Sequence, residues 1–241
     1  MRRVDLTKFW KWAWPVMTPE RFERIVQVLK RRQPDLTVIT DEVHKGRNLS
    51  AMLRSCDAVG VDEIHCVIPR NGFRAYRGTA SGSQKWVSVV HHEQVEDPVI
   101  ALRGQGFQVV AAHLSEQAVD YRQIDYTQPT AILMGAERDG LSEVAGNLAT
   151  QHIIIPMLGM SESLNVSVAC AAILLEAQRQ RELAGMYNEQ RLTPQQFASR
   201  LFQWAHPTVA EYCDQRRLTY PSLREDGELA DGPGWYRQIR E

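Results

Sequence analysis

Residues 130–141 read Thr-Ala-Ile-Leu-Met-Gly-Ala-Glu-Arg-Asp-Gly-Leu and are the most informative segment for the fold class. Four consecutive apolar residues follow Thr130, Gly135 comes directly afterwards, and Gly140 follows five residues later. A short, nearly continuous apolar run indicates a strand that is buried on both faces, as strands of parallel sheets are. Glycines let the backbone turn tightly and approach a ligand closely, and open α/β sheets bind ligands where strands end. The stretch therefore predicts a central strand followed by a binding loop.

Strand-like and helix-like stretches alternate along the chain before and after this strand. Strands are predicted at 36–40, 63–68, 86–90, 107–112, 130–134 and 151–155. Helices are predicted at 48–59, 95–103, 142–148, 165–184, 193–204 and 207–215, with one more that begins after Thr18 and an irregular tail from Pro221. Such alternation predicts an α/β fold, a mostly parallel sheet with helices on both faces, plus flanking N- and C-terminal helices.

Composition excludes several classes of protein. The 241 residues are 44% hydrophobic and 24% charged, as in ordinary globular proteins. No run of about 18 apolar residues exists, so no membrane span is expected. The four cysteines form no C-x-x-C pair and the seven histidines are scattered, so we expect no disulfide framework and no metal site. A cytoplasmic protein is the resulting expectation.

The net charge of −1 hides an asymmetry along the chain. Residues 1–34 carry nine basic and three acidic residues, a net charge of +6, whereas residues 35–182 have a net charge of −6. A polyanion would therefore bind through the N-terminal part and a few placed arginines rather than through bulk charge. The alternative is that the basic helix is only a solvated surface.

Familiar catalytic motifs are missing. There is no G-x-G-x-x-G and no P-loop, and the serine hydrolase motif G-x-S-x-G lacks its second glycine in the segment 159–163. Three other segments place polar residues beside predicted strands, namely 48–54, 133–141 and 153–167.

Each polar residue of these segments has a structural explanation beside a functional one. Asn48 and Asn165 could each cap a helix. Arg54 lies among apolar neighbours and is expected to be partly buried, with either Asp57 or a phosphate as its partner. Glu137 is either a surface carboxylate or a group that orients a donor.

The order of these segments resembles the SPOUT superfamily of RNA methyltransferases. Within it, the chain is most similar to the bacterial family that methylates the ribose 2′-hydroxyl of guanosine-18 in tRNA. The resemblance is strong over residues 18–185 and looser in the C-terminal helices. The stretches that carry it are 32–38 (Arg-Gln-Pro-Asp-Leu-Thr-Val), 57–61 (Asp-Ala-Val-Gly-Val), 153–157 (Ile-Ile-Ile-Pro-Met) and 163–169 (Ser-Leu-Asn-Val-Ser-Val-Ala).

The resemblance implies a deep C-terminal trefoil knot, S-adenosylmethionine as the methyl donor, and a homodimer that acts on tRNA. Small residues at 169–172 would allow close packing between subunits, or within one. The implied catalytic set is Asn48, Arg54, Glu137, Ser163 and Asn165. The implied cofactor-binding set is Ala112, Gly135, Ile155 and Leu164. The implied RNA-binding set is Arg21, Arg24, Lys30, Arg31, Arg32, Arg216 and Arg217.

The domain organisation expected from these observations has four parts. Residues 1–17 form an extension of unknown role, 18–34 a basic helix, 35–185 the SPOUT methyltransferase domain, and 186–241 a helical extension. Two alternatives stay open. One is a 2′-O-methyltransferase of ribosomal RNA, whose relatives often carry a longer N-terminal RNA-binding domain. The other is a non-catalytic RNA-binding protein on the same fold, which predicts erosion of the catalytic set.

Overall fold

The computed structural model describes residues 17–68, 85–136 and 140–238. The chain forms two compact units. The larger unit spans residues 32–191, and the smaller one combines the residues up to 31 with those from 192 onwards. The larger unit contains the β-sheet, and the described part of the smaller unit is mostly helical.

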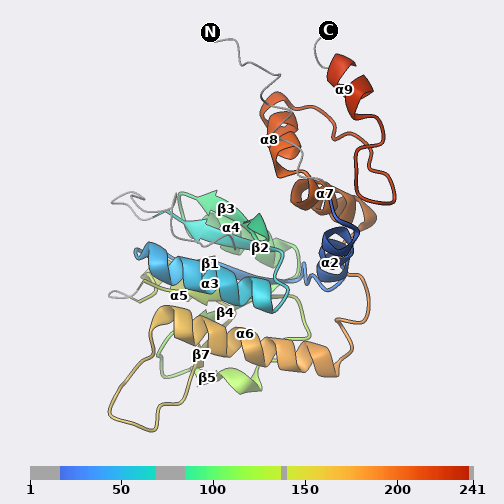
Figure 1. The fold of residues 1–241 in the computed structure, drawn as a ribbon. Coiled ribbons are helices and arrows are strands. Elements are labelled where there is room, and N and C mark those ends of the chain that lie inside the picture. The colour runs from blue at the N-terminus through green and yellow to red at the C-terminus, as the bar shows by residue number, and fades with distance from the viewer. Residues whose placement is uncertain (1–16, 69–84, 137–139, 239–241) are drawn as a thin grey trace. The chain divides into compact units, whose positions relative to one another are not determined.

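Seven parallel strands form the sheet of the larger unit, in the order β3-β2-β1-β6-β4-β7-β5 (Figure 1). Their bounds are Leu36–Thr40 (β1), Glu63–Val67 (β2), Ser88–His92 (β3), Gln108–Ala112 (β4), Val119–Asp120 (β5), Thr130–Met134 (β6) and Gln151–Ile154 (β7). Thr130 is in register with Leu36 on one side and with Gln108 on the other. The apolar run 130–134 is therefore the central strand of the sheet.

Helices cover both faces of this sheet. Helices α3 (Gly46–Ala58) and α6 (Val166–Leu183) pack on one face, and α4 (Glu96–Gly104) and α5 (Glu143–Leu148) pack on the other. A short 3₁₀ helix, η2 (Tyr121–Gln123), follows β5. Alternate residues of β6 enter opposite cores, since Ile132 packs with α3 and α6 whereas Ala131 and Leu133 pack with α4 and α5. Two-sided burial explains why this strand has no polar alternation.

The predicted strands and the observed ones agree closely, with two differences. β3 lies two residues later than predicted, and β5 was not predicted because two residues give no periodicity. The predicted cap of α3 is wrong. The helix begins at Gly46 after Lys45, so that Asn48 lies inside its first turn and is buried.

Four helices make up the described part of the smaller unit, α2 (Pro19–Leu29), α7 (Pro194–Ala205), α8 (Pro207–Arg216) and α9 (Gly232–Gln238). Thr18 caps α2 by accepting a hydrogen bond from the Arg21 amide at 3.2 Å. Thr193 and Gln196 form a reciprocal capping box at the start of α7. α9 was not predicted from the sequence, because its Gly- and Pro-rich start favours irregular structure.

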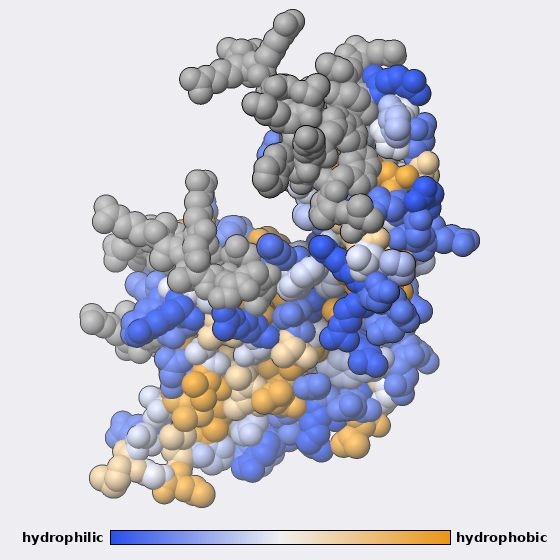
Figure 2. All heavy atoms as spheres, in the orientation of Figure 1, coloured by the Kyte–Doolittle hydropathy of each residue, from blue (hydrophilic) through white to orange (hydrophobic). Residues whose placement is uncertain are grey.

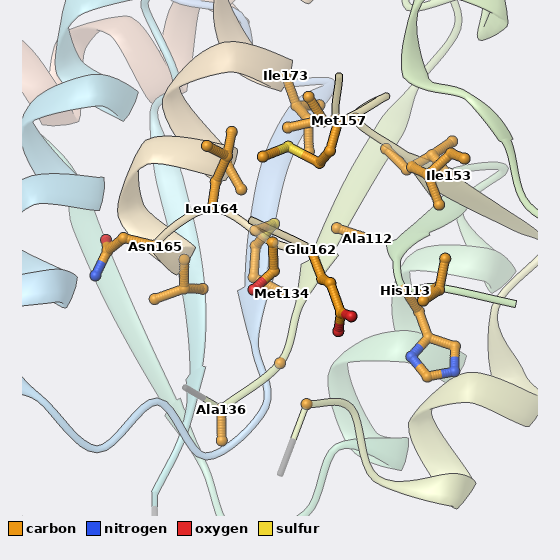
Figure 3. A pocket seen from close by; sticks show the side chains of 18 of the residues that line it. Ala112, His113, Met134, Ala136, Ile153, Met157, Glu162, Leu164, Asn165 and Ile173 are labelled. Atoms are coloured by element: carbon orange, nitrogen blue, oxygen red, sulfur yellow. The ribbon is translucent and has the colours of Figure 1, made fainter. Parts of the chain in front are cut away.

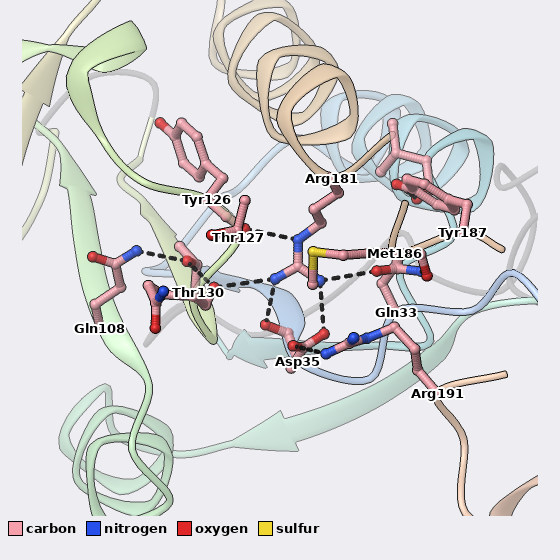
Figure 4. A network of polar contacts seen from close by, with 12 residues as sticks. Gln33, Asp35, Gln108, Tyr126, Thr127, Thr130, Arg181, Met186, Tyr187 and Arg191 are labelled. Carbon is pink, nitrogen blue, oxygen red and sulfur yellow. Dashed lines mark hydrogen bonds and ion pairs between the residues drawn. The ribbon is translucent and has the colours of Figure 1, made fainter. Parts of the chain in front are cut away.

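Arg181 is the centre of a buried polar network at the far end of α6 (Figure 4). Its guanidinium is fully buried and donates to the Asp35 carboxylate at 2.6 Å and to Gln33 Oε1 at 3.1 Å. It also donates to the carbonyl oxygens of Tyr126, Asp35 and Gln128. One side chain therefore connects the end of α6 with the segment before β1 and the segment before β6.

Arg32 is also fully buried, and this corrects one prediction. Its guanidinium donates to the Asp57 carboxylate at 2.6 Å and to the carbonyl oxygens of Val61 and Trp86, both at 2.9 Å. A fully buried guanidinium with a carboxylate partner is not available to a phosphate. Arg32 is therefore a structural residue and leaves the set of RNA-binding candidates.

The described part of the chain has no helix that is both long and apolar enough to cross a membrane. All four cysteines are buried and free. Burial raises the pKa of the Cys170 thiol to about 12, so this cysteine is an uncharged core residue.

Candidate active site

A pocket of about 670 Å³ opens where β4, β6 and β7 end (Figure 3). Its wall is made by residues 112–114, 134–136 and 153–157, which follow these strands, and by residues 162–166 at the start of α6. The residues assigned to the cofactor from the resemblance all line it, namely Ala112, Gly135, Ile155 and Leu164. The carboxyl ends of parallel strands lie at one edge of a sheet, which is why segments far apart in sequence meet here.

Two backbone hydrogen bonds join the ends of the loop after β6, where it forms part of the pocket wall. Ala136 and Gly140 exchange two backbone hydrogen bonds of 2.8 and 3.1 Å, and Gly140 has a φ of +69° that favours glycine. A Cβ on Gly135 would lie 2.3 Å from the carbonyl carbon of Gly140. Both glycines are therefore required by the backbone. The catalytic candidate Glu137 belongs to this loop but lies outside the described residues.

Asn165 connects the pocket to the first catalytic segment. As the N-cap of α6, its side-chain oxygen accepts from the Ser167 amide at 2.9 Å. Its Nδ2 lies 3.4 Å from Oδ1 of the buried Asn48. Asn165 and Ser163 both line the pocket, whereas Asn48 does not line it and reaches it through Asn165. The structure therefore brings three of the five catalytic candidates to one place.

Arg54 is not part of this group, and the expectation that it is partly buried is wrong. Its side chain is exposed, not partly buried, and Asp57 is paired with Arg32. Arg54 follows Asn48 by six residues of a helix, which places it about 9 Å further along the axis and about 120° around it. It does not line the pocket. Within one chain, the arginine and the pocket are separate.

The remaining RNA-binding candidates are exposed. Arg21, Arg24, Lys30 and Arg31 lie on α2 or just after it, and Arg216 and Arg217 lie at the end of α8. The Arg216 guanidinium stacks over the Tyr212 ring, 3.8 Å from its centroid. All six belong to the smaller unit.

The sequence reasoning missed three ionisable residues of the pocket wall, Lys45, His113 and Glu162. His113 directly follows Ala112 at the end of β4, and Glu162 lies within the segment 153–167 that had been singled out. The rule that ligands bind at strand ends could have found both. Lys45 gave no signal, because the start of α3 was placed two residues too late.

Family models match almost the whole described chain. The SpoU rRNA Methylase family matches residues 35–175, and the SpoU rRNA methylase C-terminal family matches residues 179–232. The first match contains all seven strands of the sheet.

Individual relatives agree with these matches. A tRNA (guanosine(18)-2′-O)-methyltransferase of Escherichia coli (strain K12) is 49% identical over 226 residues, which are 93% of this chain and 99% of the relative. An enzyme of the same name from Thermus thermophilus is 52% identical over 187 residues, covering 78% of this chain and 96% of the relative.

Solved structures share the fold. A TrmH/SpoU tRNA modifying enzyme of A. aeolicus superposes with a TM-score of 0.73 at 40% identity, covering 79% of this chain and 97% of that one. The SpoU methyltransferase AviRb of Streptomyces viridochromogenes, in complex with AdoMet, superposes with a TM-score of 0.55 at 31% identity, covering 63% and 62%. These matches confirm the resemblance to RNA methyltransferases that the sequence motifs predicted. The chain belongs to the SpoU rRNA methylase family.

Proposed function

We propose that this protein transfers a methyl group from S-adenosylmethionine to the ribose 2′-hydroxyl of guanosine-18 in tRNA. The observation that carries the proposal is the pocket at the ends of β4, β6 and β7, whose wall contains the four predicted cofactor residues. The full-length similarity to enzymes named for this reaction supports the choice of substrate.

The residues of the pocket fit S-adenosylmethionine. Its volume lies within the range of roughly 300–1,000 Å³ that is usual for small-molecule sites. Ile153, Ile155 and Leu164 offer apolar surface for an adenine ring, and the strand ends offer backbone N–H and C=O groups for its edge. The cofactor supplies an electrophilic methyl group on a positively charged sulfur.

The chain's own residues would position the ribose and stabilise its oxygen. Asn165 and Ser163 line the pocket and would hold the ribose or the loop, and Asn48 would fix the orientation of Asn165 through the contact between their amides. Arg54 would hold the neighbouring phosphate and stabilise the alkoxide that develops as the hydroxyl proton leaves. A guanidinium is a poor base, so we assign Arg54 no proton transfer. Glu137 would orient Arg54.

Because Arg54 does not line the pocket of its own chain, we propose that a second copy supplies it. An unpartnered apolar surface supports the homodimer. Leu158 and Met160 precede α6 and are exposed, as are Val168 and Leu175 along the helix. Figure 2 displays hydrophobic residues gathered over this part of the surface. Exposed apolar patches of this kind mark interaction sites, and two-fold dimers are the commonest oligomers.

The small residues of α6 divide between two roles. Cys170 is fully buried in the core of its own subunit, so it packs within one subunit and not between subunits. Ala171 and Ala172 are half-buried and flank the exposed Val168 and Leu175. They would permit close approach of the partner helix.

We also propose the trefoil knot of the SPOUT fold for the C-terminal part of the sheet. Strand order supports it, since β6 pairs with β4 and the chain then passes to the far side of β4 to form β7. The loops that follow β6 and β7 meet in the same pocket. Such a knot would be one of the rare exceptions to unknotted topology.

For the tRNA we propose six exposed basic residues of the smaller unit, namely Arg21, Arg24, Lys30, Arg31, Arg216 and Arg217. The domains proposed are the basic helix 18–34, the methyltransferase domain 35–185 and the C-terminal extension 186–241, with residues 1–17 outside any assigned role. The four free thiols suit a reducing cytoplasm.

The experiment is methylation of unmodified tRNA and, separately, of ribosomal RNA with labelled S-adenosylmethionine, followed by mapping of the labelled ribose. Label on the guanosine-18 ribose is expected. Label in ribosomal RNA alone would refute the tRNA assignment, and no label in either RNA would favour a non-catalytic binding protein.

Mixed dimers test whether Arg54 acts across the subunits. Leu164→Trp fills the pocket from an exposed position, and Arg54→Ala removes the arginine. Each variant alone should be inactive. A mixture should regain a fraction of wild-type activity, because the intact pocket of one variant meets the intact arginine of the other. A mixture as inactive as its components would contradict an arginine that acts in the partner's pocket.

A further inference from the structure

Glu162 is the acidic residue that lines the pocket in the described part of the chain. It lies in the loop between β7 and α6, and its side chain is exposed to solvent. Figure 3 shows this side chain directed into the space between Met134, the last residue of β6, and His113, the first residue after β4. The other ionisable residues of the wall are Lys45 and His113. A negative charge thus enters a pocket whose remaining wall is largely apolar and backbone.

We propose that Glu162 makes the pocket discriminate between the methyl donor and its demethylated product, by placing a carboxylate near the positively charged sulfur. The inference rests on the proposed function, since it requires the donor to bind in this pocket. Glu162 would be a specificity-determining residue and would take no part in bond making or breaking.

The argument follows from the change of charge in the reaction. As the ribose oxygen forms its bond to the methyl carbon, the sulfur–carbon bond breaks and its electron pair stays on the sulfur. The hydroxyl proton leaves to solvent. The sulfur is a cation before the transfer and a neutral thioether after it. The Glu162 carboxylate therefore attracts the donor and loses this attraction to the product.

The size of the effect follows from the exposure of Glu162. Attraction between two unit charges in a solvated protein pocket changes a binding constant by about ten-fold. The amino and carboxylate groups of the ligand are the same before and after transfer. A residue that recognises them, or the adenine, affects both ligands alike. A selective effect on the donor is therefore the signature of a carboxylate that faces the sulfur.

The test is calorimetric titration of the wild type and of Glu162→Gln with S-adenosylmethionine and with S-adenosylhomocysteine. Glutamine keeps the size and polarity of the side chain and removes the charge. We expect the Kd of the donor to rise about ten-fold and that of the product to change less than two-fold. Raising the salt concentration should shrink the difference between wild type and variant, because salt screens exposed charges.

Glu116→Gln is the matched control. Glu116 is an exposed glutamate in the segment after β4, and it does not line the pocket. The control should leave both dissociation constants unchanged, which excludes an effect of net charge alone.

Three outcomes would overturn the inference, and they separate it from the proposed function. Equal weakening of both ligands would place Glu162 near a group that donor and product share. Unchanged binding of both, with the wild type binding normally, would remove Glu162 from ligand recognition while leaving the proposed function intact. If the wild type binds neither ligand, the proposed function fails together with the inference.

Discussion

Replacing Arg181 with methionine should destabilise the larger unit severely, although Arg181 lies at the end of α6 opposite to the pocket-lining residues. Methionine matches the length and apolar stem of arginine but donates no hydrogen bond. The change would leave Gln33 and the carbonyl oxygens of Tyr126, Asp35 and Gln128 without this donor. The Asp35 carboxylate would keep only its ion pair with Arg191, which has an N–O distance of 2.6 Å.

The expected magnitude follows from these contacts. Breaking a buried ion pair by removing one partner costs about 3–5 kcal/mol. The surviving pair with Arg191 argues for the lower end, about 3 kcal/mol, because Asp35 would retain a countercharge. Arg191→Met is the matched control. Its side chain is 32% exposed, so its removal should cost about 1 kcal/mol or less.

The assay is urea unfolding of both variants and the wild type at one protein concentration, followed by circular dichroism. Concentration must be held constant because association stabilises a folded state. A loss for Arg181→Met no greater than that for Arg191→Met would refute the reasoning.

The acid sensitivity of the wild type gives a second measure. Burial raises the pKa of Asp35, but the Coulomb attraction and hydrogen bonds of Arg181 and Arg191 outweigh burial and leave the pKa below the ordinary 3.8. A lowered carboxyl pKa contributes stability above the unfolded value, and this contribution is lost as the pH falls through the folded value. Arg181→Met should therefore lose less stability than the wild type does as the pH falls below about 4.

Four further outcomes are expected. Arg54→Ala should reduce the rate of methyl transfer by at least about a hundred-fold. The Kd for S-adenosylmethionine and the urea midpoint should stay unchanged, because Arg54 is exposed, and substantial residual activity would remove Arg54 from the mechanism. Lys30→Gln should weaken tRNA binding and reduce the salt dependence of that binding, both measured by filter binding. Arg32→Gln should mainly lower the free energy of unfolding, by about 3 kcal/mol, and a normal urea midpoint for this variant would contradict the buried role of Arg32. Gly135→Ala should raise the Kd for S-adenosylmethionine at least ten-fold, because the new Cβ collides with the backbone of Gly140. Burial, with a smaller contribution from the neighbouring His92, lowers the pKa of His65 to about 4, so that the unfolded chain binds a proton on this histidine at a higher pH than the folded chain does. Stability should therefore fall as the pH drops from about 6.5 to 4, and His65→Phe should make the urea midpoint less sensitive to pH in that window.

The sheet was predictable because its strands are short apolar runs that end at glycine, proline or polar residues. β1 and β6 have the bounds that were predicted, since both are buried along their whole length. β5 has two half-buried residues, and too few for a pattern. Sequence patterns thus placed the two fully buried strands to the residue and missed the two-residue strand β5.

The pocket was predictable in outline, and the charges were not. Asn165 was recognised as a cap and a site residue, and it has both positions in the structure. Arg32 and Lys30 look alike in the sequence, yet one is buried and the other exposed. The difference depends on Asp57, Val61 and Trp86, which the fold brings to Arg32 from 25 to 54 residues away. Local charge patterns contain no information about such partners.

The place of β6 between β1 and β4 has a consequence for biosynthesis. Residues 36–40 leave the ribosome long before residues 130–134. One edge of β1 therefore stays unpaired until β6 is made, while β2 and β3 are already available on the other side. A nascent chain that stops short of residue 130 exposes two unsatisfied strand edges, β1 and β4, which could pair with each other or with another chain. Folding of this unit should therefore be a late event, completed only when the central strand has been inserted, and slow because its pairings are distant in sequence.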